Sequence, residues 1–436
     1  MSFEDREKAR QLTEERERAL LVGVDTGEEE DFDYSIEELK SLAEACDMEV
    51  VGICTQRMER VNKAHYIGTG KIDEVKEFAE LQEADIIIFD NSLTPSQLRN
   101  LQKLLEKPVM DRTALILDIF SSRAKTREAK LQVETARLQY LLSRLVGMHE
   151  ALTRQGGTSG SMSSRGAGEK KLELDRRRIE HRLVELNKEL EEVKKERETQ
   201  RKKRVQSKTP KISLVGYTNA GKSTIMNQMV EAFVGETEKK VFEKDMLFAT
   251  LDTTVRNIQV GNNQDFMLSD TVGFIHKLPH ALVKAFRSTL EEIKTADLIL
   301  YVIDYSDPHY KQHIETTNET LRELEAGDIP LLYVYNKVDK VAPEGTVLFA
   351  RETENAIYIS AKNKEDIQKL VNKIISKVYG GYVDAVFMIP YTQGGIASLL
   401  QEKGIVEAVD YLEEGTQIKG RFHVAEINKY CEYIQK

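Results

Sequence analysis

A glycine-rich octapeptide, GYTNAGKS at residues 216–223, places the strongest constraint on the fold of this chain. It matches the phosphate-loop pattern G-x-x-x-x-G-K-S, follows the apolar run KISLV and precedes the helix-like stretch STIMNQMVEAF. Glycines in such a loop let backbone N–H groups converge on phosphates, and the loop is expected between a strand and a helix. We therefore predict an α/β domain with a doubly wound sheet and a nucleotide site at this loop.

Three further motifs follow the loop in order, each after a strand-like run, and together they favour a guanine nucleotide. They are D-x-x-G at 270–273, NKVD at 336–339 and SAK at 360–362. Asn336 can brace the phosphate loop. The Asp339 carboxylate can accept hydrogen bonds from both N1–H and the N2 amino group of guanine, a pair of donors that adenine lacks. We therefore predict that the site selects GTP over ATP.

Each of these motifs has an expected chemical role. Lys222 is predicted to reach the β- and γ-phosphate oxygens, and Ser223 to offer its hydroxyl to Mg²⁺. Asp270 is expected to hold a magnesium-bound water, and the Gly273 N–H to contact the γ-phosphate and so report its loss. The next residue, Phe274, can neither position a water nor take its proton, so no catalytic residue is assigned.

Length and composition bound the class of protein. A chain of 436 residues suggests about three domains. No run of about 18 apolar residues is present, and the charged start MSFEDREKAR has no apolar signal segment. The three cysteines are scattered, which argues against a disulfide framework or a zinc site. We expect a cytoplasmic protein without a membrane span.

The charge is unevenly distributed. The net charge is −10, yet residues 121–211 hold 24 Lys and Arg against 13 Asp and Glu. Such asymmetry indicates a polyanionic partner at this segment. The alternative is a solvated helix whose charges pair at i,i+4, which much of 185–200 fits.

Hydrophobic patterns divide the chain into four parts. Strand-like and helix-like runs alternate over 1–110 and predict a small parallel α/β domain, in which GTGK at 68–71 is a turn before a helix. Two apolar stripes at helical spacing predict a coiled-coil hairpin over 111–205, joined by a flexible Gly/Ser loop at 155–168. The phosphate-loop domain is expected over 206–378, and a small α+β domain over 379–436.

The chain resembles the HflX GTPases over nearly its whole length. The resemblance is carried by YIGTGK at 66–71, RGAGEKKLELDRRRI at 165–179, GYTNAGKST, LFATLDTTVR at 247–256 and DTVGFIHKLPHALVKAFRSTLEE at 270–292. It implies that residues 248–252 form switch I, with Thr250 as the second protein ligand of Mg²⁺ beside Ser223. It also implies binding to the large ribosomal subunit and to intact ribosomes.

The full predicted site follows from the motifs and this resemblance. The predicted nucleotide-binding residues are Gly216, Tyr217, Thr218, Asn219, Ala220, Gly221, Lys222, Ser223, Thr224, Phe248, Ala249, Thr250, Leu251, Asp252, Asp270, Thr271, Val272, Gly273, Asn336, Lys337, Asp339, Ser360, Ala361 and Lys362. The predicted metal ligands are Ser223 and Thr250.

Three functions remain open at this stage. The first, which we favour, is a monomeric GTPase whose nucleotide state gates binding to ribosomes, which it splits or rescues when they are stalled or idle. The second is a GTP-dependent adaptor for RNA or protein with slow hydrolysis as a timer. The third is an RNA remodeller that uses a nucleotide at the N-terminal domain. For hydrolysis, two sources of help are open: K⁺ held by Asn219, or the docked ribosome.

Overall fold

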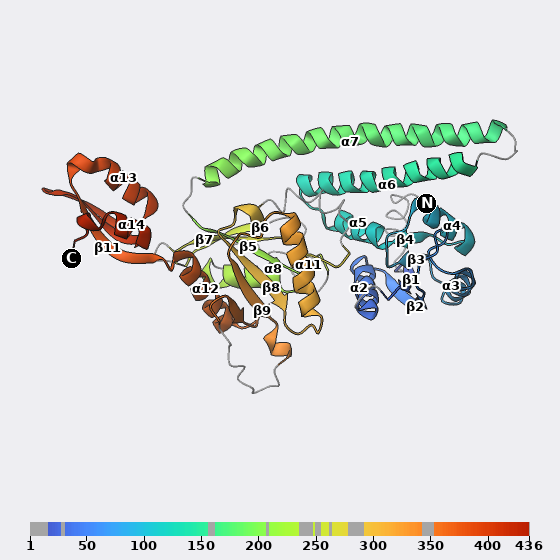
Figure 1. Ribbon diagram of the computed structural model, residues 1–436, viewed down its shortest axis with the longest axis horizontal. Coiled ribbons are helices and arrows are strands. Elements are labelled where there is room, and N and C mark those ends of the chain that lie inside the picture. The colour runs from blue at the N-terminus through green and yellow to red at the C-terminus, as the bar shows by residue number, and fades with distance from the viewer. Residues whose placement is uncertain are drawn as a thin grey trace.

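We describe the fold from a computed structural model of the chain. The residues that it describes are 16–27, 31–155, 162–205, 209–234, 247–248, 254–260, 264–277, 292–341 and 353–435. An N-terminal domain and a GTPase-like domain lie side by side under a long helical hairpin, and a small C-terminal domain lies at the far end (Figure 1). The predicted multidomain α/β fold is confirmed.

Four parallel strands form the N-terminal sheet, in the order β2-β1-β3-β4. The elements are β1 (Arg18–Asp25), α2 (Phe32–Ala45), β2 (Glu49–Arg57), α3 (Thr69–Leu81), β3 (Ile86–Phe89), α4 (Pro95–Leu105), β4 (Val109–Asp111) and α5 (Arg112–Arg123). Successive side chains of a strand point to opposite faces. In β1, Leu21 therefore packs with α2 and α5, whereas Leu20 packs with α3 and α4. GTGK was predicted to be a turn before a helix, but Gly68 is the N-cap of α3 and residues 69–71 form its first turn.

The core of this domain extends past residue 110, where the sequence placed the end of the domain. In α5, Leu115 and Phe120 are buried in the same cluster as Leu21 of the sheet. The sequence does not show to which domain α5 belongs, because its apolar residues continue into those of the following helix. The N-terminal core therefore includes α5, and the same cluster continues with Ala129, Val133 and Ala136.

The predicted hairpin consists of α6 (Arg127–Gln155) and α7 (Met162–Val205), which lie along each other (Figure 1). Arg182 on α7 pairs with Glu134 on α6 at 2.9 Å. The predicted loop at 155–168 is too long, because residues 162–168 belong to α7 and 156–161 lie outside the described residues. Glycine and serine disfavour a helix individually, but extending an existing long helix costs far less than nucleating one.

Six strands form the central sheet, in the order β10-β9-β8-β5-β7-β6, with only β6 antiparallel to its neighbour. The elements are β5 (Lys211–Gly216), α8 (Lys222–Phe233), β6 (Thr254–Ile258), β7 (Phe266–Asp270), η1 (Ile293–Thr295), β8 (Leu298–Asp304), α11 (Tyr310–Glu323), β9 (Leu331–Asn336), η2 (Val338–Lys340), β10 (Ala356–Tyr358) and α12 (Lys364–Tyr379). Helices α8 and α12 cover one face, and α11 covers the other. The carboxyl ends of the parallel strands therefore converge on one edge, where ligands bind in such sheets.

The C-terminal domain has three antiparallel strands, in the order β11-β13-β12. Its elements are β11 (Tyr382–Ile389), η3 (Tyr391–Gln393), α13 (Gly394–Lys403), β12 (Ile405–Leu412), β13 (Gly415–His423), α14 (Val424–Lys429) and η4 (Cys431–Tyr433). Phe387 and Phe422 meet edge to face in its small core, 4.7 Å between ring centroids. Across the part of the chain that the structure describes, no helix is long and apolar enough to cross a membrane.

Candidate functional site

The phosphate loop runs from the end of β5 to the start of α8, as predicted. Gly216 and Gly221 have backbone φ angles of 152° and 97°. A Cβ on Gly216 would lie 2.1 Å from the carbonyl oxygen of Val302, and one on Gly221 would lie 2.2 Å from Nδ2 of Asn336. Both positions therefore require glycine, because only glycine combines these φ angles with such a close approach.

Lys222 is buried at the first turn of α8, and its ammonium donates to two carbonyl oxygens of the loop. The acceptors are those of Gly216 at 3.0 Å and Tyr217 at 2.6 Å. Burial lowers the pKa of this ammonium to about 8, although the nearby Asp270 opposes the shift. An ammonium has three donors, so a third remains for a phosphate oxygen after the two bonds to described residues.

Ser223 and Asp270 meet at the end of β7. The Ser223 hydroxyl donates to Oδ2 of Asp270 at 2.7 Å, and the Asp270 side chain is fully buried. A hydroxyl and a carboxylate are hard oxygen donors of the kind that Mg²⁺ prefers, so these two residues fit a magnesium ion. The predicted second ligand, Thr250, lies outside the described residues, as do Ala249, Leu251 and Asp252.

Asn336 links the phosphate loop to the expected base pocket. Its Nδ2 donates to the carbonyl oxygen of Ala220 at 2.9 Å, and its Oδ1 accepts from the Ala361 amide at 2.9 Å. The predicted brace is therefore confirmed, and it joins the phosphate loop to SAK. Lys337, in a left-handed conformation at φ 63°, pairs with Asp304 at 2.7 Å.

Asp304 is a residue of this edge that the sequence motifs did not indicate. It ends β8, which comes between β7 and β9 along the chain, and its carboxylate accepts a hydrogen bond from the Lys337 ammonium. The available signal was a carboxylate at the carboxyl end of an apolar strand, where ligand-binding edges of parallel sheets carry their polar residues.

The turn after Asp270 packs directly on the phosphate loop. The Thr218 amide donates to the carbonyl oxygen of Phe274 at 2.7 Å, and the Phe274 amide donates to that of Gly216 at 3.2 Å. A Cβ on Gly273 would lie 2.8 Å from Cα of Thr218 and 3.0 Å from Nζ of Lys222. The structure thus brings the D-x-x-G turn against the lysine predicted to hold the phosphates.

The other predicted residues lie where their motifs place them. Tyr217, Asn219 and Ala220 belong to the loop, Thr224 to the first turn of α8, Thr271 and Val272 to the turn after β7, Asp339 to η2, and Ser360 and Lys362 to the segment after β10. Phe248 is separate from the loop motifs: its ring is buried against Phe120 of α5, with 4.7 Å between ring centroids.

Comparison with known proteins identifies the family. Family models match residues 33–121 (GTP-binding GTPase N-terminal), 123–204 (GTP-binding GTPase middle region) and 211–337 (50S ribosome-binding GTPase). GTPase HflX of Alkalihalophilus pseudofirmus is 44% identical over 398 residues, 91% of this chain and 91% of the relative. GTPase HflX of Escherichia coli is 37% identical over 420 residues, 95% of this chain and 96% of the relative.

The chain belongs to the HflX GTPase family. It is a P-loop GTPase that hydrolyses GTP. Among solved structures, a GTP-binding protein from Sulfolobus solfataricus in complex with GDP is 26% identical, with a TM-score of 0.42, covering 83% of this chain and 98% of that chain.

This HflX GTPase has contacts at its phosphate loop that the sequence did not reveal. The Tyr217 ring stacks on His313 of α11, with 3.9 Å between ring centroids and 8° between planes. Its hydroxyl donates to the carboxylate of Glu38, in α2 of the N-terminal domain. Burial, reinforced by Glu38, raises the pKa of the Tyr217 hydroxyl well above its usual value. The phosphate loop of this family member is therefore attached to the N-terminal domain.

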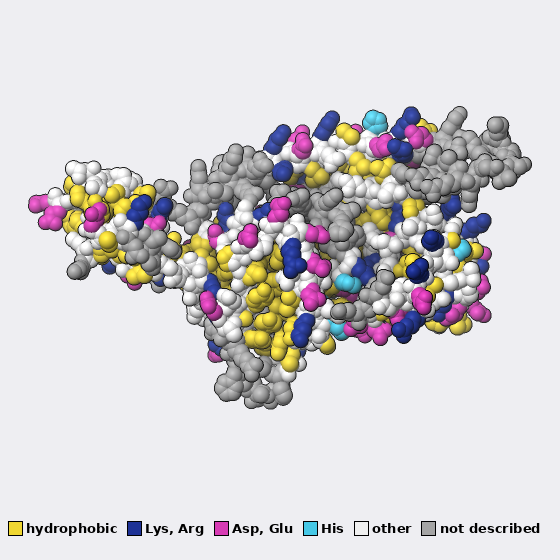
Figure 2. Space-filling model, in the orientation of Figure 1, with side chains coloured by type: hydrophobic (Ala, Val, Ile, Leu, Met, Phe, Trp, Pro, Cys, Tyr) yellow, Lys and Arg dark blue, Asp and Glu magenta, His cyan; other side chains and the backbone are white. Residues whose placement is uncertain are grey.

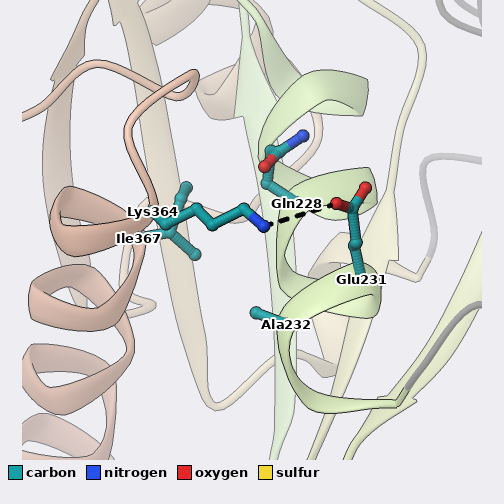
Figure 3. A pocket seen from close by; sticks show the side chains of 5 residues that line it. All are labelled: Gln228, Glu231, Ala232, Lys364 and Ile367. Atoms are coloured by element: carbon teal, nitrogen blue, oxygen red, sulfur yellow. Dashed lines mark ion pairs between the residues drawn. The ribbon is translucent and has the colours of Figure 1, made fainter.

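A small pocket in the GTPase domain is separate from this site. It lies between the second half of α8 and the start of α12, where Lys364 reaches toward Glu231 at 3.8 Å (Figure 3). Gln228, Ala232 and Ile367 complete its lining, and none of the predicted nucleotide residues takes part.

Proposed function

We propose that this HflX GTPase binds guanine nucleotides through the motif residues of the preceding section. Gly216–Thr224 hold the phosphates, Gly273 contacts the γ-phosphate, and Asp339 with Ser360–Lys362 form the base pocket. Ser223 and Thr250 hold Mg²⁺, which neutralises charge that develops on the phosphate oxygens during hydrolysis. The Asn336 bridge between loop and base pocket supports this assignment, because one side chain fixes both ends of the nucleotide site.

Competition between nucleotides that differ in their base tests the assignment. Asp339→Asn replaces a double acceptor by a group with a donor, so it should weaken GTP binding and favour xanthosine triphosphate, whose 2-oxo group accepts a hydrogen bond. Competition experiments with GTP, ATP and xanthosine triphosphate measure this. Equal binding of ATP and GTP by the wild-type GTPase domain would contradict the assignment.

We further propose that the protein binds the large ribosomal subunit in a nucleotide-dependent way, and splits or rescues stalled or idle ribosomes. The observation that carries this is the joining of a GTP switch to a basic helical hairpin. Helix α7 has 44 residues, about 66 Å at 1.5 Å per residue. Its surface displays Lys and Arg among Asp and Glu (Figure 2).

Hydrogen bonds attach the hairpin to the N-terminal domain, which would keep its orientation fixed when it binds a large partner. Asp111, at the start of α5, accepts hydrogen bonds from the Tyr140 hydroxyl at 2.7 Å and from the Arg144 guanidinium, both on α6. Asp111 also caps α5 by accepting from the Ala114 amide at 3.0 Å. A force on the hairpin would therefore reach the N-terminal domain through a buried carboxylate.

One observation favours the alternative of a GTP-dependent adaptor. Arg176, Arg177 and Arg178 pair with Glu180, Glu173 and Asp175 of their own helix, at 2.9, 3.1 and 3.8 Å. Exposed pairs of this kind stabilise a helix only slightly, but they reduce the local positive charge that rRNA would meet. The adaptor reading therefore stays as the second candidate.

Co-sedimentation with purified ribosomal subunits separates the two readings. The protein should sediment with large subunits in the presence of a non-hydrolysable GTP analogue and remain in the supernatant with GDP. Adding it with GTP to intact ribosomes should increase free subunits in a density gradient. Association only with free RNA or with a protein, and not with subunits, would favour the adaptor.

A further inference from the structure

A buried charge cluster of the N-terminal domain faces the GTPase domain. It consists of Glu38 on α2, Asp90 after β3 and Arg112 at the start of α5, and the three residues are 0–5% exposed. The Arg112 guanidinium pairs with Asp90 at 2.7 Å and with Glu38. Burial raises the pKa of Glu38, and Arg112 only partly offsets this. Burial alone would raise the pKa of Asp90 too, but Arg112 and Lys277 hold it below its usual value.

Lys277, from the segment after D-x-x-G, completes this cluster. Its ammonium pairs with Oδ2 of Asp90 at 2.5 Å and donates to the Ser35 hydroxyl at 2.9 Å. The cluster then holds two carboxylates, one guanidinium and one ammonium. Without Lys277 it would hold one uncompensated buried carboxylate, which is costly in a low-dielectric interior.

The backbone around Lys277 is fixed at two further points. The His276 amide donates to the Tyr217 hydroxyl at 2.6 Å, and the His276 carbonyl oxygen accepts from Arg112 at 3.3 Å. Lys277 itself has a left-handed backbone, φ 55°, which a residue with a side chain adopts only where its surroundings hold it. The segment 274–277 is therefore held between the phosphate loop and the N-terminal domain.

Helix α11 adds a second set of contacts between the same two domains. The Tyr34 hydroxyl lies 2.5 Å from Nε2 of His313, and Nε2 of His309 lies 2.6 Å from Asp31. The N-terminal domain thus meets the GTPase domain at α11, at Tyr217 and at 276–277, so its docking is not a single flexible contact.

These contacts set the position of the γ-phosphate sensor. Gly273 lies four residues before Lys277 and packs on Thr218 and Lys222. A γ-phosphate is contacted by both the phosphate-loop lysine and the D-x-x-G amide. Because Gly273 is held against Lys222, the two groups that contact a γ-phosphate stay close together.

We propose that Lys277 is a positioning residue through which the docked N-terminal domain holds residues 271–277 close to the phosphate loop, so that docking favours GTP over GDP. The Lys277–Asp90 ion pair makes this coupling, and the Tyr217–Glu38 hydrogen bond supports it. The inference goes beyond ribosome binding, because both partners of the ion pair belong to this chain.

The coupling is tested by the ratio of two affinities in the full-length protein. Lys277→Met removes the charge and keeps most of the side-chain length. We expect it to weaken a non-hydrolysable GTP analogue about tenfold, within the usual range of coupling between sites, and to change GDP affinity less than twofold. Lys277→Arg, which retains the charge, should restore most of the lost preference.

A double variant that includes Asp90 is the second test, and a variant at a distant lysine is the control. Asp90→Asn combined with Lys277→Met should weaken the analogue no more than Lys277→Met alone, since both act on one ion pair. Lys294→Met removes a lysine of the same domain that pairs with Glu325 at 2.7 Å, and it should change neither affinity. Lys277→Met alone decides the question if Asp90→Asn disturbs the N-terminal core.

Two results would overturn the proposal. Equal weakening of the analogue and GDP by Lys277→Met would show a purely structural role. Unchanged or tighter binding of the analogue would show that the ion pair does not favour the GTP state.

Discussion

The amide of Thr218 in the phosphate loop donates a 2.7 Å hydrogen bond to the carbonyl oxygen of Phe274, directly after D-x-x-G. The Phe274 side chain points the other way, into a cluster with Val215, Tyr301 and Leu321. Its ring is 2% exposed. Phe274 is therefore a core residue whose backbone ties the turn to the phosphate loop, and help with the hydrolytic water must come from elsewhere.

Substitutions at Phe274 should affect stability more than chemistry. Phe274→Ala should lower the free energy of unfolding of the GTPase domain by about 3–5 kcal/mol, as expected for a buried phenylalanine. Phe274→Leu keeps most of the apolar volume and the backbone bonds, so its GTP turnover should change without being abolished. Denaturant unfolding and single-turnover hydrolysis measure the two effects. A folded Phe274→Leu protein without hydrolysis would place the ring in the reaction.

Nucleotide binding should be coupled to proton uptake at Lys222. Its pKa of about 8 in the free protein means that the ammonium loses its proton as pH rises through that value. A bound phosphate keeps the ammonium charged, so GDP binding should take up about half a proton at pH 8 and weaken above it. Calorimetric titrations in two buffers of different ionisation enthalpy count these protons. The same binding enthalpy in both buffers would contradict this.

The nucleotide motifs could be predicted because their chemistry is local. Gly216, Gly221 and Lys222 must sit at fixed spacing around a phosphate, and Asn336 ends its own strand, so short sequence patterns identify them. The charge cluster could not be predicted in this way. Glu38, Asp90, Arg112 and Lys277 come from four separate segments, and only packing of the two domains brings them together.

Asn219 in the phosphate loop is the residue that we predict to bind a potassium ion. Asn219 is left-handed, φ 58°, and exposed. Its side chain has no hydrogen-bond partner within the described part of the chain, and Asn336 supplies the brace for the loop. We expect hydrolysis to rise when K⁺ replaces Na⁺, because a cation beside the phosphates supplies positive charge during the reaction. Asn219→Ala should remove this gain. An equal gain in the variant would exclude Asn219 as the ligand.

Ribosome binding should depend on salt and on the hairpin arginines. Replacing Arg176, Arg177 and Arg178 by Gln should weaken co-sedimentation with large subunits and reduce its salt dependence, because phosphate contacts release counterions. Intrinsic GTP hydrolysis should stay nearly unchanged.

A matched control removes three positive charges elsewhere. Lys369, Lys373 and Lys377 lie on α12 of the GTPase domain, and their replacement by Gln should leave co-sedimentation unchanged. If the arginine variant also sediments like the wild type, these arginines only pair with the acidic residues of α7.

Some structural features could not be predicted because they depend on interactions beyond a short stretch of sequence. Glycines and serines at 162–168 predicted a loop, but a long helix extends through them. No catalytic role was predicted for Phe274, and its ring belongs to the core. In the helix, cooperativity outweighed the preference of single residues.

The decisive experiment is GTP turnover measured with and without large ribosomal subunits. The account predicts slow intrinsic turnover, because Phe274, directly after D-x-x-G, is buried and cannot position a water. It predicts acceleration by large subunits of roughly tenfold or more, equivalent to lowering the activation free energy by at least about 1.4 kcal/mol. Fast turnover by the isolated protein, unchanged by large subunits, would contradict it.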